Sequence, residues 1–143
     1  MPQSDKATVV SQRIYDYLIE GRLILGLEEV YDGDEQLIPK TPSVCVIMGN
    51  KNRLLSGVPF RTDNTFEIFL MVYHGKIQDS QLNQRECMNL AEAIEDYLHL
   101  DKTMGDNVIH GYCTGIEPGA LRLGNTMMFV SRITWSGLTK TLT

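Results

Sequence analysis

The segment Thr65–His74 constrains the fold more than any other part of the sequence, because it is apolar on both faces of an extended chain. One face carries Phe66, Ile68, Leu70 and Val72, and the other carries Phe69, Met71 and Tyr73. Successive side chains of a strand point to opposite faces, so a strand with this pattern is covered on both sides. The sequence therefore predicts a central strand with the core on one face and a second layer, or a neighbouring subunit, on the other.

In the sequence, one segment with helical periodicity precedes this strand and another follows it. Apolar residues recur at helical spacing through residues 7–25, and again through residues 80–100, where Cys87, Ala91, Ile94 and Leu98 form one stripe. Further strands are predicted within 43–74 and 107–136, and Gly124-Asn125 is typical of a hairpin turn. No repeat or linker interrupts the chain, so residues 1–143 are predicted to form a single domain. The fold class is α+β, with an antiparallel or mixed sheet of four to five strands and both helices packed on it.

Charge is unevenly distributed along the 143 residues. The chain holds 13 basic and 18 acidic side chains, and five of the acids fall within residues 28–35 of the predicted loop 28–42, which leaves 13 acids against 13 bases in the rest of the chain. These five are Glu28, Glu29, Asp32, Asp34 and Glu35. The most basic stretch holds Lys51, Arg53 and Arg61 in a turn-rich region. We interpret both groups as partner-binding surfaces of opposite sign, since the acidic balance argues against a dedicated nucleic-acid binder.

Residues that carry chemistry are sparse. Three widely spaced cysteines form no disulfide framework, and we expect Cys45 and Cys87 to pack as small core side chains. Asp32 and Asp34 have the spacing of a calcium loop, but residue 37 is Leu where such a loop requires Gly. The sequence therefore predicts no catalytic residue, no cofactor and no metal site. It also predicts no membrane helix and no signal peptide, since the longest apolar runs are too short and residues 1–8 are polar.

Two sets of residues are candidates for subunit contact. Gly111, Cys113 and Gly115 alternate along a predicted strand, so we expect them to share a nearly flat face against which something packs closely. Phe69, Met71 and Tyr73 form the second apolar face of the central strand. Burial of this face within a single chain is the alternative, if the two helices cover opposite sides of the sheet.

The order and texture of the elements resemble those of the tail terminator, or tail completion, proteins of tailed bacteriophages. The resemblance covers about residues 6–136. It depends on an N-terminal helix before a Pro-led strand, Pro42–Ile47, on the strong strand Glu67–Tyr73 followed by a long helix, and on the closing strand Phe129–Trp135.

The resemblance implies a structural virion protein and not an enzyme. Members of this family form a homo-hexameric ring that caps the tail tube, stops its polymerisation and joins the tail to the head-side connector or stopper protein. The partners implied are thus other copies of the chain, the tail tube protein and the connector, with DNA only in transit through the lumen. The location implied is the tail or neck of the virion, after assembly in the host cytoplasm.

Other functions remain open on the sequence alone. Another head–tail connector or neck component is the nearest alternative. A small cytosolic adaptor or binding domain is a second, because a fold does not fix a function. A nuclease is a weaker alternative, because Asp63 and Glu67 are spaced suggestively but no E-x-K sequence follows on a matching strand.

Overall fold

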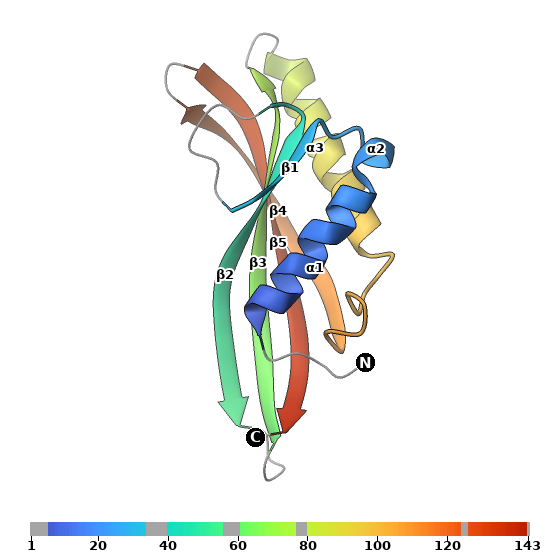
Figure 1. The fold of residues 1–143 in the computed structure, drawn as a ribbon. Coiled ribbons are helices and arrows are strands. Elements are labelled where there is room, and N and C mark those ends of the chain that lie inside the picture. The colour runs from blue at the N-terminus through green and yellow to red at the C-terminus, as the bar shows by residue number, and fades with distance from the viewer. Residues whose placement is uncertain (1–5, 34–39, 56–60, 77–79, 124–125, 143) are drawn as a thin grey trace.

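The computed structural model describes residues 6–33, 40–55, 61–76, 80–123 and 126–142. The described residues form three helices and five strands, with α3 between the third and fourth strands (Figure 1). The elements are α1 (Ala7–Glu20), α2 (Arg22–Leu25), β1 (Glu29–Asp32), β2 (Ser43–Leu55), β3 (Arg61–Lys76), α3 (Ser80–Leu98), β4 (His110–Leu123) and β5 (Thr126–Leu142).

The sheet has five strands in the order β1-β2-β3-β5-β4. β1 runs parallel to β2, and every other pair is antiparallel, so the sheet is mixed. β2 and β3 pair around Ile47 opposite Phe69, and β3 and β5 pair around Ile68 opposite Trp135. The α+β class and the five-stranded mixed sheet agree with the prediction from sequence.

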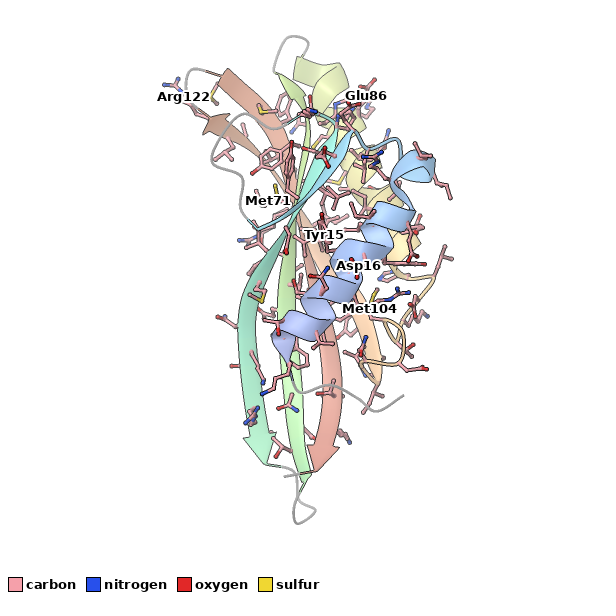
Figure 2. The ribbon with its side chains drawn as sticks, viewed as in Figure 1. Tyr15, Asp16, Met71, Glu86, Met104 and Arg122 are labelled. Atoms are coloured by element: carbon pink, nitrogen blue, oxygen red, sulfur yellow. The ribbon has the colours of Figure 1, made fainter. Side chains whose placement is uncertain are left out.

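One face of the sheet carries the main core. Alternate strand residues such as Val46, Leu70 and Ile133 are fully or almost fully buried there, in one cluster with Ile14 of α1 and Ile94 of α3. Both helices therefore contribute to the same core cluster, and Figure 1 shows them on one side of the strands. Burying each such aliphatic side chain contributes about 1.5–3 kcal/mol to folding. Asp16, in contrast, lies on the exposed side of α1 (Figure 2).

The opposite face holds a second, smaller apolar cluster. Cys45, Tyr73 and Met128 are buried in it, and Tyr31 and Met71 pack against them. The hydroxyl oxygen of Tyr31 accepts a hydrogen bond from the backbone N–H of Lys40 at 3.1 Å. Tyr31 of β1 thus lies on the same face as its register partner Cys45 of β2 and helps to cover it.

The predicted loop 28–42 contains a strand that the sequence analysis missed. Residues Glu29–Asp32 form β1, which pairs with Ser43–Val46. Only Val30 of its four residues is fully buried, so the strand has no apolar alternation that a sequence pattern could reveal. Its acidic residues gave the segment the composition of a loop.

Three other boundaries differ from the prediction. The helix expected over 7–25 is interrupted at Gly21, where a Cβ atom would overlap the ring of Tyr97. The helix expected over 80–100 ends at Leu98, and the last strand continues past residue 136 to Leu142. This extension is polar, but it pairs with β3 as far as Arg61, and Thr139 within it is fully buried.

Candidate assembly surfaces

The acidic segment lies at the β1 margin of the sheet. Glu28 and Asp32 are exposed and Glu29 is half-buried, whereas Asp34 and Glu35 lie outside the described residues. The segment is held in place by backbone hydrogen bonds, from Glu28 N–H to the carbonyl of Pro42 at 2.7 Å and from Gly33 N–H to the carbonyl of Val46 at 2.8 Å. These acids are therefore presented from a strand fixed along the first half of β2.

The basic residues lie at the other end of β2. Lys51 and Arg53 are exposed on β2, and the backbone of Arg61 begins β3 at the same end of the hairpin, its side chain lying outside the described residues. The Lys51 ammonium lies 5.7 Å from the centre of the Phe66 ring. The structure brings a further base to this end, because Lys140 of β5 pairs in register with Asp63.

A buried polar row fixes this basic end across three strands. Arg53 Nε donates a hydrogen bond to Asn64 Oδ1, and Asn64 Nδ2 donates one to Thr139 Oγ1, each at 3.1 Å. Asn64 and Thr139 are fully buried. The acidic and basic groups predicted from sequence are thus not brought together. They occupy the two ends of β2, and each is held by its own hydrogen bonds.

The residues predicted as an interface on the central strand lie on the sheet face opposite the main core. Phe69 and Met71 lie half-buried on the side without a helix, but Tyr73 is buried in the cluster with Cys45 and is not available to a partner. Phe69 is covered in part by the guanidinium of Arg132, 5.0 Å from the ring centre. That guanidinium is held by Glu117 of β4 through a salt bridge of 2.9 Å.

The expectation that Gly111, Cys113 and Gly115 share one flat face is wrong. The register of β4 against β5 shifts between Cys113 and Gly115, so a β-bulge moves Gly115 to the other face of the sheet. The close packing expected at Gly111 is real, but its partner is Trp135 of the same chain, which a Cβ at Gly111 would overlap. Around Gly115 a Cβ would meet nothing within 4 Å.

Along the first half of β4, backbone N–H groups on its outer edge already donate hydrogen bonds within the chain and are not available to pair with another strand. The N–H of Gly111 donates to the carbonyl of Lys102 at 2.6 Å, and the N–H of Cys113 donates to Nε2 of His99 at 2.9 Å. Farther along the strand, Pro118 has no N–H to offer. Bulges and prolines of this kind keep an edge strand from pairing with other sheets. No pattern in the sequence indicated this role for His99.

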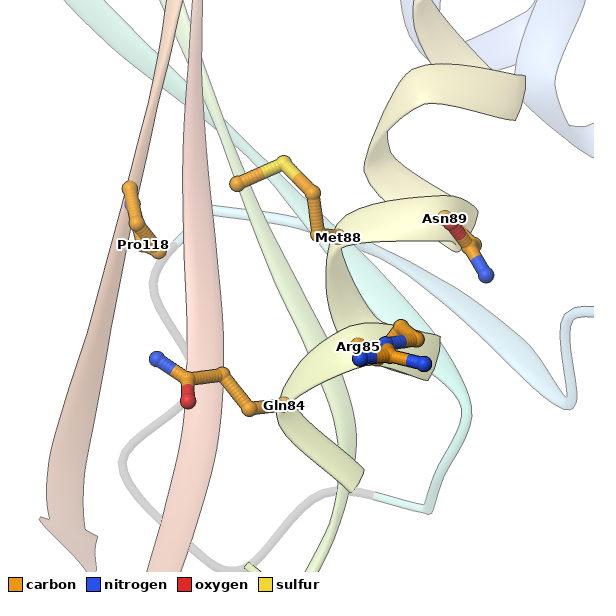
Figure 3. Close-up of a pocket in the computed structure, with 5 residues that line it drawn as sticks. All are labelled: Gln84, Arg85, Met88, Asn89 and Pro118. Carbon is orange, nitrogen blue, oxygen red and sulfur yellow. The ribbon is translucent and has the colours of Figure 1, made fainter. Parts of the chain in front are cut away.

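A groove separates the N-terminal half of α3 from β4. It has a volume of about 460 Å³ and is lined by Gln84, Arg85, Met88, Asn89 and Pro118. Figure 3 shows Gln84 and Met88 extending from α3 toward the strand that carries Pro118. Met88 is half-buried and the other four are exposed, so among the described lining residues Met88 forms an apolar floor and Arg85 places a cation at the polar rim.

An apolar knob projects from α2, which the sequence analysis had merged into the first helix. Leu23 is 87% exposed and Ile24 is 83% exposed, the two most exposed large apolar residues among those described. Gly21 and Gly26 bracket a helix of only four residues, which is too short to turn two adjacent aliphatic side chains inward. In the sequence, the two glycines that flank these successive aliphatic residues were the feature that could have indicated the knob.

Burial raises the pKa of two cysteine thiols, one on α3 and one on β4. Burial, and secondarily the negative charge of Glu95, raises the pKa of the Cys113 thiol to about 12. Burial likewise raises the pKa of Cys87, which packs against Ser131 at 3.4 Å. Within the described ranges no three His, Cys, Asp or Glu residues are grouped so as to hold a metal ion. Among the described helices, none combines the length and apolarity needed to cross a membrane.

No family model and no curated protein matches this chain.

Proposed function

We propose that this protein is a structural component of a tailed-phage virion, a tail terminator that assembles as a homo-hexameric ring on the end of the tail tube. The ring stops polymerisation of the tube and joins the tail to the head-side connector or stopper protein. It is assembled in the host cytoplasm and remains in the neck of the virion, where DNA passes through its lumen.

The observation that carries this proposal is that three candidate contact surfaces lie apart from one another on one small subunit. An acidic margin at β1, a basic end of the β2–β3 hairpin and a sheet face without a helix lie on different parts of the subunit. A protein that caps a tube must contact the tube, its own neighbours and a connector at the same time, so it needs several such surfaces. The order of the elements supports the proposal as well, through the family resemblance.

The charge distribution fits a DNA conduit. Each phosphate that a basic side chain neutralises strengthens binding, so a lumen that lets DNA slide needs few exposed cations. Here Lys51, Arg53 and Lys140 are gathered at one end of the sheet, whereas other exposed bases, among them Lys40 and Arg122, are scattered singly over the described surface. We place that end at a protein contact and not along the lumen.

The test is removal of the gene from the phage that encodes it, followed by electron microscopy of the lysate and mass spectrometry of wild-type virions. A terminator leaves overlong tails without heads when it is absent, and the protein is found in wild-type virions. Tails of normal length that fail to join heads would assign the protein to another neck position. Infectious particles of normal form from the deletion strain, with no copy of the protein in virions, would overturn the proposal.

A further inference from the structure

His99 joins the end of α3 to the outer edge of β4. Its Nε2 atom accepts a hydrogen bond from the backbone N–H of Cys113 at 2.9 Å, and both residues are half-buried. The accepting nitrogen of a neutral imidazole carries no proton, so the proton of His99 is on Nδ1. An imidazolium has an N–H on both nitrogens and no acceptor, so it cannot take the Cys113 N–H. This hydrogen bond therefore exists only while His99 is neutral.

Two further hydrogen bonds hold the same part of β4. The N–H of Gly111 donates to the carbonyl of Lys102 at 2.6 Å, and the N–H of Ile109 donates to the carbonyl of Leu138 at 2.8 Å. Both join backbone groups, whose hydrogen bonding does not change when a side chain takes up a proton. Of these three hydrogen bonds, only the one to His99 depends on a group that titrates.

The charged form of His99 has a different partner on α3. Glu95 precedes His99 by four residues, the spacing at which side chains meet on one face of a helix, and its carbonyl accepts the N–H of His99 at 3.0 Å. Burial, and then the charge of Glu95, raises the pKa of the Cys113 thiol, so this carboxylate lies near the same part of β4. A cation at the C-terminal end of a helix is also stabilised by the helix dipole.

Other charged or titratable side chains lie close to His99 along the chain. Asp101 forms a salt bridge with Arg13 of α1 at 3.4 Å, and Lys102 is an exposed cation. The others are Asp96 on α3 and His110 and Tyr112 on β4, all of them exposed. Glu95 is the carboxylate among them whose charge acts on Cys113, and it is therefore the partner that we assign to the imidazolium.

We propose that His99 is a pH-sensitive contact that holds the edge of β4 at neutral pH and releases it in acid. The neutral imidazole binds the Cys113 N–H, whereas the imidazolium turns to the carboxylate of Glu95. Histidine side chains change charge between about pH 5 and 8, so the change falls in a range where the chain can be studied folded. The released N–H is an unpaired donor on a margin strand, which is the kind of group that pairs with other strands. This inference does not depend on the proposed function, because it concerns a single chain.

Hydrogen exchange of individual amides, followed by NMR on the full chain and corrected for the intrinsic exchange rate at each pH, tests the proposal. The protection factor of the Cys113 amide should fall roughly tenfold between pH 8 and pH 5, while that of the Ile109 amide should stay constant. Carbon and nitrogen chemical shifts of the His99 ring give its titration and its tautomer. The loss of protection should follow that titration, and the neutral ring should carry its proton on Nδ1.

Variants separate the two partners of His99. His99→Gln keeps an acceptor that does not titrate, so the Cys113 amide should be equally protected at both pH values. Glu95→Gln removes the partner of the charged form, so protection should persist to a lower pH than in the wild-type chain. Glu28→Gln is the matched control, because it removes an exposed carboxylate at the other margin of the sheet and should leave the profile unchanged. His110→Gln should leave it unchanged as well, and circular dichroism shows that each variant is folded.

Three results would overturn the proposal. The first is equal protection of the Cys113 amide at pH 8 and pH 5, whether the ring stays neutral or another group holds the amide. The second is a pH dependence that survives in His99→Gln, which would assign it to a different group. The third is a neutral His99 ring with its proton on Nε2. A Glu95→Gln profile identical to that of the wild-type chain would overturn the assignment of Glu95 as the partner of the imidazolium.

Discussion

The indole of Trp135 on β5 lies against the backbone of Gly111 on β4, its diagonal neighbour across the ladder. Gly137, which is opposite Gly111 in register, would also place a Cβ into this ring. The two glycines thus form a flat surface against which the single tryptophan of the chain packs, and this tryptophan is fully buried. Any side chain at Gly111 or Gly137 has to displace a large, rigid ring within a packed core.

Gly111→Ala is therefore expected to destabilise the fold by about 1–3 kcal/mol, the usual cost of overpacking. Gly115→Ala is the matched control on the same strand, because a Cβ there meets nothing within 4 Å. Urea denaturation followed by the fluorescence of Trp135 measures both changes. Equal urea midpoints for the two variants would show that the indole does not pack against Gly111.

The contrast between these two glycines shows what the sequence can and cannot predict. Alternation of Phe66, Ile68 and Leu70 with Phe69 and Met71 predicted the central strand and its faces, because period two follows directly from strand geometry. The same rule failed at Gly115, because the β-bulge before it inserts one extra residue and no local sequence pattern indicates that insertion.

The candidate surfaces were predictable only where composition marked them. Clustered acids and bases identified the segments around Glu28 and Lys51, which the structure places at opposite ends of β2. The groove beside Met88 depends on how α3 approaches β4, a tertiary relationship without local signature. The burial of Tyr73 likewise depends on Cys45 and Met128 from other strands.

The contact between α1 and α3 depends on Tyr97. Its ring stacks on Tyr17 with centroids 4.4 Å apart, and its hydroxyl donates a hydrogen bond to the Tyr17 carbonyl at 3.0 Å. Tyr97→Phe keeps the stack and removes the hydrogen bond, so it should cost about 0.5–1.5 kcal/mol. Thermal or urea unfolding measures the loss, and Tyr112→Phe on the exposed side of β4 should be neutral. A Tyr97→Phe chain as stable as wild type would contradict the role given to this hydroxyl.

His99 should protect the edge of β4. Its Nε2 accepts the N–H of Cys113, and an imidazole removed from that position leaves a half-buried donor without its partner. His99→Ala is expected to speed hydrogen exchange of the Cys113 amide by roughly tenfold, since net hydrogen bonds contribute about 1 kcal/mol. His110→Ala, at an exposed position on the same strand, should leave that amide unchanged. Unaltered exchange in the His99 variant would show that the edge is closed by other groups.

The thiol of Cys113 should be unreactive in the folded chain. Burial, and then Glu95, raises its pKa from an ordinary 9.0 to about 12. Since the thiolate is the nucleophile, alkylation by iodoacetamide at pH 9 should be roughly a thousandfold slower than in the urea-unfolded chain. Peptide mapping by mass spectrometry separates this site from Cys45 and Cys87. Rapid labelling of Cys113 in folded protein at pH 9 would contradict the raised pKa.

The same shift makes stability depend on alkaline pH. The unfolded chain loses this proton near pH 9.0, and the folded chain holds it until about pH 12. The contribution of the neutral thiol is therefore complete below pH 9 and is lost progressively as the pH rises toward 12. Cys113→Ser should flatten this part of the profile in urea midpoints measured between pH 8 and about 11. A profile that keeps its full slope in Cys113→Ser would assign the alkaline loss to other groups.

The basic end of the hairpin should determine head joining in the proposed function. Lys51→Glu with Lys140→Glu reverses two exposed charges and leaves Arg53, Asn64 and Thr139, the three residues of the polar row, unchanged. The subunit should therefore fold and cap tails of normal length. Attachment of DNA-filled heads should fall at least tenfold, because the reversed charges turn the electrostatic attraction that we propose for this end into repulsion. Infectious titre after mixing purified tails with heads measures the loss. Lys102→Glu with Arg122→Glu changes the net charge equally away from this end, so a loss of the same size in that control would mean that overall charge, and not this surface, governs joining.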